Sequence, residues 1–65
     1  MIPVTRLDKR VVVINVEMIK MVEAAPDTII TLINGDTLMV RESVDEVVRL
    51  AVDYARKIRG FSLVE

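Results

Sequence analysis

Apolar and β-branched residues alternate with polar ones on both sides of an Asn-Gly pair near the middle of the chain. The two runs cover residues 28–33 and 36–41, and Asn34-Gly35 between them is the dipeptide most typical of a β-hairpin turn. Pro26-Asp27 marks the start of the first run, because both residues favour turns over strand interiors. The pattern therefore predicts a β-hairpin that turns at Asn34-Gly35.

A three-residue loop gives this hairpin one uniformly apolar face, whereas a two-residue loop does not. With a two-residue turn, Thr31 would pair with Leu38, and both faces would mix polar and apolar side chains. With the loop at residues 33–35 and Gly35 in the left-handed conformation, Ile30 pairs with Leu38 instead. A buried face strongly specifies register, so we expect the three-residue loop with a bulge at Gly35. The inner face then carries Ile30, Leu32, Leu38 and Val40, and the outer face carries Ile29, Thr31, Thr37, Met39 and Arg41.

Two more strands are predicted near the start of the chain, at residues 2–7 and 11–15. Pro3 favours an edge position for the first strand, because proline cannot donate a ladder hydrogen bond. Asp8-Lys9 fits a tight turn between the two strands. Every residue from Val11 to Ile14 is apolar, which indicates a strand covered on both faces. Such cover would come either from the centre of a small barrel or from an interface.

Asn15 interrupts this apolar run, and its side chain is suited to capping a single helical turn over residues 16–18. The strand pattern resumes at residues 19–24 and ends at Ala25-Pro26. The first half of the chain and the hairpin together predict a small antiparallel sheet of about four to five strands, either open or closed into a barrel.

One amphipathic helix is predicted over residues 44–59. Ser43 and Glu46 match the capping box, in which a serine hydroxyl accepts from a helical N–H and a glutamate reaches back to the serine amide. Gly60 is a typical stop residue, and residues 61–65 form a short apolar tail. The helical spacing is carried by Val44, Val47, Val48, Ala51, Tyr54, Ala55 and Ile58. The fold class is therefore α+β, with one C-terminal helix packed on the sheet.

The apolar surface exceeds what so small a fold can cover by itself. The 65 residues make a single domain, and a chain of this size buries only about 60% of its unfolded surface. It contains no Cys and no His, so disulfides and the common zinc ligand sets cannot stabilise it, yet 52% of its residues are apolar. We therefore expect a homo-oligomer. The expected interface residues are Val11, Val13, Ile29, Ile33, Met39, Leu50 and Val52.

The composition predicts neither catalysis nor a cofactor. Without Cys or His, the candidate catalytic groups are Asp, Glu, Lys, Tyr54, Ser and Thr. The carboxylates among them either have structural roles in caps and helix pairs or are scattered along the sequence. The two glycines, Gly35 and Gly60, cannot build a phosphate-binding loop. We expect no enzymatic activity, no cofactor, no metal ion and no small-molecule substrate.

The location of the protein is expected to be the cytoplasm. No apolar run approaches the ~20 residues that a membrane span needs. The first residues also lack the basic-then-apolar order of a signal peptide.

Two basic clusters and three methionines have an ordinary structural interpretation beside a functional one. A solvated hairpin tip explains Arg6, Lys9 and Arg10, and compensation of the helix dipole explains Arg56, Lys57 and Arg59. Nucleic-acid binding would need more aromatic residues than the two present, and the net charge of −1 gives no general attraction to phosphate. The methionines either form an adaptable binding surface or fill gaps in the core; they are Met18, Met21 and Met39.

The order and spacing of short motifs along about 60 residues resemble the FlbD/SwrD family of small flagellar and swarming-motility proteins. The matching stretches are Val4-Thr5-Arg6-Leu7, Ile14-Asn15, Ile19 through Glu23, Pro26-Asp27-Thr28, Ile30-Thr31-Leu32, Asn34-Gly35, Val40 and Glu42-Ser43-Val44. The family usually has Asn-Gly where this chain has Asp8-Lys9, so the first hairpin is where a different turn is expected.

This resemblance implies a non-enzymatic accessory of the bacterial flagellum that supports motor power and swarming through protein–protein interaction. It implies a link to motor or basal-body proteins at the inner face of the membrane, and it supplies no catalytic or ligand-binding residues. The alternative is a small regulatory nucleic-acid-binding protein that controls flagellar gene expression. The isoelectric point of about 5.3 and the scarcity of aromatic residues disfavour this alternative.

Overall fold

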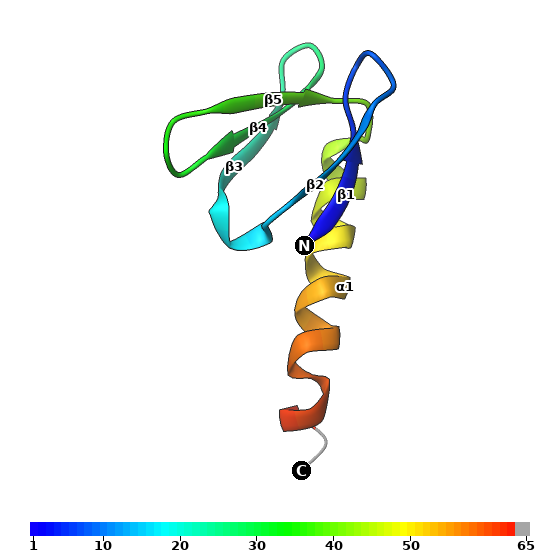
Figure 1. Ribbon diagram of the computed structural model, residues 1–65, viewed down its shortest axis with the longest axis vertical. Coiled ribbons are helices and arrows are strands. Elements are labelled where there is room, and N and C mark those ends of the chain that lie inside the picture. The colour runs from blue at the N-terminus through cyan, green and yellow to red at the C-terminus, as the bar shows by residue number, and fades with distance from the viewer. Residues whose placement is uncertain (64–65) are drawn as a thin grey trace.

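The computed structural model describes the backbone of residues 1–63 and the side chains of residues 1–58. Within this part of the chain, five strands and one 3₁₀ turn precede a single long helix (Figure 1). The elements are β1 (Ile2–Thr5), β2 (Val11–Ile14), η1 (Val16–Met18), β3 (Ile19–Ala24), β4 (Thr28–Leu32), β5 (Thr37–Val40) and α1 (Val44–Leu63). The fold class is α+β, as the sequence predicted.

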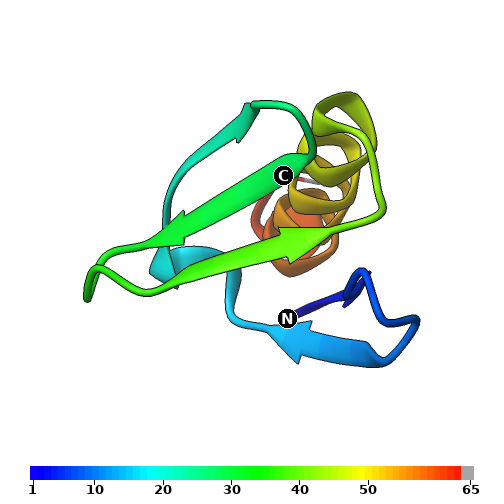
Figure 2. The ribbon, with the colours of Figure 1, turned by 90° about the horizontal axis from the view of Figure 1, so that it is seen from above.

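The strands form two antiparallel sheets that meet at one isolated bridge. One sheet pairs β1 with β2, and the other has the order β3-β4-β5. The bridge joins Arg6 to Val40, and the Arg41 amide donates to the Thr5 carbonyl at 2.7 Å, so β1 lies beside the end of β5. The sheet does not close, because β2 and β3 lie at the two outer edges of this arrangement (Figure 2). The barrel alternative is therefore wrong.

The central hairpin has the predicted register. Ile30 pairs with Leu38 and Thr28 with Val40. The loop contains three residues, and Gly35 has a φ of 96°. The Gly35 amide donates to the Leu32 carbonyl at 2.9 Å, which closes the turn.

The hairpin that joins β1 to β2 uses the same turn, so the expectation of a different turn at Asp8-Lys9 is wrong. Its loop is Leu7-Asp8-Lys9, closed by a hydrogen bond from the Lys9 amide to the Arg6 carbonyl at 2.9 Å. Lys9 has a φ of 76°, a left-handed conformation that glycine adopts more readily. The Asp8 carboxylate accepts from the Arg10 amide at 3.1 Å, just as Asn34 accepts from the amide two residues later in the central hairpin. The replacement of Asn-Gly by Asp8-Lys9 thus retains a residue at positive φ.

The 3₁₀ turn between the two sheets is capped as predicted. The Asn15 side chain accepts a hydrogen bond from the Glu17 amide at 3.1 Å. The Met18 carbonyl accepts from the Ile33 amide at 2.8 Å, so this turn is tied to the tip of the central hairpin.

The core lies between the inner faces of the sheets and the first turns of α1. Its fully buried side chains are Ile2, Val4, Ile30, Val40 and Val47. The inner face predicted for the central hairpin is confirmed, because Leu32 and Leu38 also pack against this cluster.

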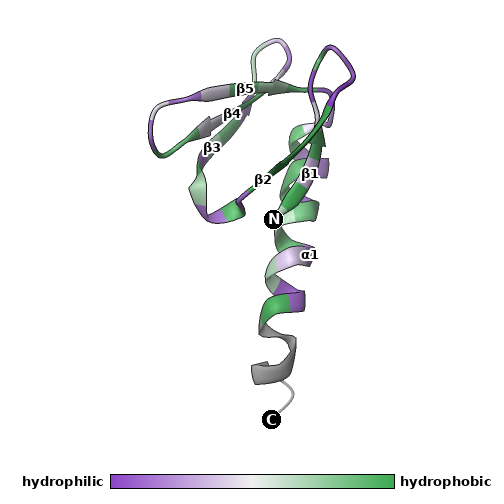
Figure 3. Cartoon of the chain, viewed as in Figure 1, coloured by the Kyte–Doolittle hydropathy of each residue, from purple (hydrophilic) through white to green (hydrophobic). Residues whose placement is uncertain are grey.

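β2 does not have the two-sided cover that its apolar run indicated. Val12 and Ile14 are half-buried, whereas Val11 and Val13 are 67% and 59% exposed. The expectation failed within this chain because a single helix covers one side of an open sheet. Figure 3 shows that β1 and β2 are largely hydrophobic and that the loop joining them is hydrophilic.

The helix begins as predicted and ends later than predicted. The Ser43 amide donates to the Glu46 carboxylate at 2.8 Å, and the Glu46 amide donates to the Ser43 hydroxyl at 3.1 Å, which confirms the capping box. The prediction that the helix stops before Gly60 is wrong, because α1 continues to Leu63. One glycine costs a helix only about 1 kcal/mol relative to alanine, which does not by itself end it.

The second half of α1 projects away from the sheets (Figure 1). A helix of 20 residues is roughly 30 Å long, and the longest dimension of the molecule is 42 Å. The predicted tail at 61–65 is part of this helix up to Leu63, and its last two residues lie outside the described chain.

Candidate interaction surfaces

A carboxylate joins the start of the helix to the first strand. Glu42 accepts hydrogen bonds from the backbone amide and the hydroxyl of Thr5, both at 2.8 Å. Burial opposes ionisation of this carboxyl, but the two bonds from Thr5 and the nearby Arg41 charge outweigh it and lower the pKa of Glu42. This contact fixes where α1 leaves the sheet. Sequence reasoning missed it, because residues 37 positions apart gave no local signal.

The outer face of the three-stranded sheet exposes apolar side chains at adjacent positions. Ile29 pairs with Met39, and Met21 lies on the same face of the neighbouring strand β3. Met21 and Met39 are 46% and 47% exposed, and Ile29 is half-buried. Ile33, also predicted as an interface residue, is exposed at the hairpin tip. Met18, by contrast, is half-buried in η1.

The remaining predicted interface residues lie on other elements. Val11 and Val13 are on β2, on the face of the strand that points away from the core. Val52 is exposed on α1, where it lines an open groove, whereas Leu50 packs against the core. The structure therefore distributes the seven residues over β2, the central hairpin and the helix.

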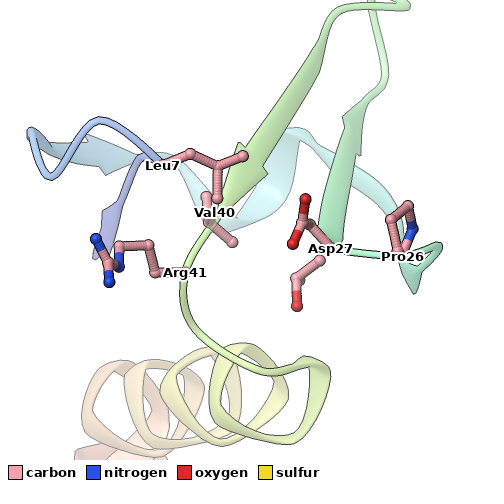
Figure 4. A pocket seen from close by; sticks show the side chains of 6 residues that line it. Leu7, Pro26, Asp27, Val40 and Arg41 are labelled. Carbon is pink, nitrogen blue, oxygen red and sulfur yellow. The ribbon is translucent and has the colours of Figure 1, made fainter.

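An open depression lies where the first hairpin, the β3–β4 turn and the end of β5 meet (Figure 4). It has a volume of about 480 Å³, and its lining residues are Leu7, Pro26, Asp27, Thr28, Val40 and Arg41. Thr28 and Val40 are buried, whereas Leu7 is 44% exposed. Asp27 and Arg41 lie on opposite sides of Val40 (Figure 4), so opposite charges flank the depression.

Sequence reasoning did not identify this depression as a site. It assigned Pro26-Asp27 to a turn and Leu7 to a strand end, and no periodicity connects those segments with Arg41. One signal was present: all the lining residues except Arg41 belong to the stretches that carry the family resemblance.

Two carboxylates of the described chain, those of Asp8 and Glu46, make local structural contacts. Asp8 accepts from the backbone amide and the guanidinium of Arg10, and these hydrogen bonds lower the pKa of Asp8. Glu46 is held in the helix cap. The described residues include no group of three or more Asp, Glu, Cys or His side chains that could hold a metal ion.

The basic clusters do not lie together. Arg6, Lys9 and Arg10 are at the tip of the first hairpin, and Arg56 and Lys57 are on the projecting part of α1, toward the opposite end of the molecule (Figure 1). Arg59 lies outside the described side chains. This arrangement gives no support to the nucleic-acid-binding alternative, which would need the cations to follow one backbone path.

In the described part of the chain, α1 lacks the apolar stretch that a membrane-spanning helix requires. A search of curated proteins and a search of solved structures found no match. A comparison with family profiles, however, matched residues 1–59 to FlbD, described as flagellar and swarming motility proteins. This match covers every strand and most of the helix, which confirms the resemblance. The chain belongs to the FlbD family of flagellar and swarming motility proteins.

Proposed function

We propose that this protein is a non-enzymatic accessory of the bacterial flagellum that supports motor power and swarming by binding another flagellar protein. The observation that carries the proposal is the family match over residues 1–59. The partner would be a motor or basal-body protein, met at the inner face of the membrane.

The side-chain chemistry supports binding over catalysis. The carboxylates of Asp8, Glu42 and Glu46 are each committed to hydrogen bonds that hold a turn or a helix start. The surface instead offers exposed apolar side chains beside charged ones, as protein-binding surfaces do. Phosphatase, protease and nucleotide-hydrolysis assays, with and without divalent metals, should therefore give background rates. Turnover that is lost on one Asp or Glu substitution would contradict a purely binding role.

The depression around Leu7 is the surface we assign to the partner. All but one of its lining residues lie in the stretches that carry the family resemblance, and three of them are exposed: Leu7, Pro26 and Asp27. Exposure leaves these side chains free for a partner, whereas buried residues such as Val40 also serve the core. A partner segment would cover Leu7 with an apolar side chain and present charges to Asp27 and Arg41.

A complementation experiment tests this role. Removal of the gene from a flagellated bacterium that encodes this chain should reduce swarming and the rotation speed of tethered cells at high load. Leu7→Glu should fail to restore both, because it puts a charge where the partner would cover the exposed leucine side chain. Val52→Glu is the matched control: Val52 is 43% exposed, close to the 44% of Leu7, but lies on the helix.

Two results would contradict the proposal. Full swarming and full torque after gene removal would contradict the flagellar role itself. Restoration by Leu7→Glu as complete as by the wild type would place the partner on another surface.

A further inference from the structure

The outer edge of β2 carries backbone groups directed away from the rest of the sheet. The Arg6 amide donates to the Arg10 carbonyl at 2.8 Å, so these two residues form a hydrogen-bonded pair. Such pairs alternate along an antiparallel ladder, so Val4–Val12 is the next hydrogen-bonded pair. Val11 and Val13 therefore direct their N–H and C=O groups to the open edge.

An independent contact agrees with this alternation. Thr5 is the residue opposite Val11, and its amide points away from β2 to the Glu42 carboxylate at 2.8 Å. Pro3, opposite Val13, has no amide hydrogen and needs none at a position that does not face β2.

The edge of β2 lacks the features that usually protect an edge strand. Its four residues contain no proline, no charge and no bulge, and the side chains of Val11 and Val13 are exposed. The other outer strand, β3, has these features: it carries Lys20 and Glu23, and its register shifts near Met21. The outer strands of the two sheets thus differ: β3 has protective features, whereas β2 is suited to pairing.

We propose that β2 pairs antiparallel with β2 of a second copy of this chain, about a twofold axis at Val12. In this register Val11 lies opposite Val13 of the second copy, and the N–H and C=O groups that both residues direct outward become partners. The exposed valine side chains then cover one another across the axis. This inference concerns self-association alone and does not depend on the flagellar role.

The charges around β2 favour a second copy in this orientation. Arg6, Lys9 and Arg10 precede the strand and outnumber Asp8, which pairs with Arg10, and Glu17 follows it. Antiparallel pairing brings the basic end of one copy to the acidic end of the other, whereas parallel pairing would place Arg10 beside its own equivalent. A twofold contact of this kind is self-complementary and closes after two copies.

Sedimentation equilibrium of the purified chain tests the proposal. The contact is short, so we expect a dimer with a dissociation constant in the micromolar range or weaker. Val13→Lys should weaken the dimer by about tenfold or more, because the charge enters the contact twice. Val48→Lys is the matched control, since Val48 is an exposed valine on α1, and it should leave the dimer unchanged. Circular dichroism checks that both variants remain folded.

A second variant separates the backbone from the side chain. N-methylation of the Val13 amide, introduced by chemical synthesis, removes one outward N–H without changing any side chain and should also disrupt the dimer. A wild-type species of 7.3 kDa at concentrations up to about 1 mM would overturn the proposal. A dimer that Val13→Lys leaves intact, or that Val48→Lys dissociates, would overturn it as well.

Discussion

Lys9 and Gly35 occupy equivalent positions in two hairpin loops of the same design, with φ angles of 76° and 96°. Each is the third loop residue, and each follows a side chain, Asp8 or Asn34, that accepts a hydrogen bond from the backbone two residues later. The chain thus builds one turn from two different sequences, and only one of them has a glycine where the backbone favours it.

Lys9→Gly should stabilise the protein. The left-handed conformation costs a residue with a Cβ about 1–2 kcal/mol, so replacing Lys9 by glycine removes that cost. The greater conformational freedom of glycine in the unfolded chain offsets about 0.4–1 kcal/mol of this stabilisation. The free energy of unfolding, measured by urea denaturation, should rise by about 0.5–1 kcal/mol. A decrease in the free energy of unfolding would mean that contacts of the Lys9 side chain stabilise the fold by more than its left-handed backbone destabilises it.

Gly35→Val should destabilise the protein by about 1 kcal/mol or more, because a β-branched residue is penalised at positive φ. A Cβ placed on Gly35 meets no atom within 4 Å, so the loss would come from the backbone conformation and not from a clash. Gly35→Asn is the control and should cost less, since asparagine tolerates this conformation. A Gly35→Val protein that melts at the wild-type temperature would contradict the turn assignment.

Glu42→Gln should cost about 1.5–3 kcal/mol, the range for hydrogen bonds to a charged group. The pKa of Glu42 is lower in the folded protein than its ordinary value of 4.5. The stabilisation is therefore complete above that value and is lost as pH falls through the folded-state pKa. Denaturation at pH 7 and at progressively lower pH should show the difference between wild type and Glu42→Gln shrinking with acidity. A difference independent of pH would show that the charge of Glu42 does not contribute.

Ser43→Ala should cost about 0.5–2 kcal/mol, whereas Ser43→Asp should be nearly neutral. The Ser43 hydroxyl accepts from the Glu46 amide at the first turn of α1, and an aspartate can replace it as acceptor. Thermal unfolding followed by circular dichroism measures both changes. Equal losses for the two substitutions would show that the hydroxyl is not the relevant acceptor.

Features set by neighbours in sequence could be predicted from the residues alone. The register of the central hairpin followed from one uniformly apolar face, and the caps at Asn15 and Ser43 followed from contacts over two or three residues. The end of the helix was mispredicted. A single glycine destabilises a helix by only about 1 kcal/mol, and α1 continues past Gly60 to Leu63.

Features set by distant segments could not be predicted in this way. The run from Val11 to Ile14 shows that β2 is apolar, but not whether a second layer covers it. The contact between Thr5 and Glu42 needs the topology before the two residues become neighbours. The depression around Leu7 likewise exists only because two turns and a strand end meet.

The contact between Thr5 and Glu42 also affects the order in which the chain can fold during synthesis. The strands β3, β4 and β5 pair with their sequence neighbours, so their contacts close short loops and form early. The docking of β1 joins residues 37 positions apart, so the first hairpin, although synthesised first, must wait for Glu42 to emerge from the ribosome. The core-facing side chain of β2, Ile14, therefore gains its packing partners only after the second sheet and the start of the helix have been made.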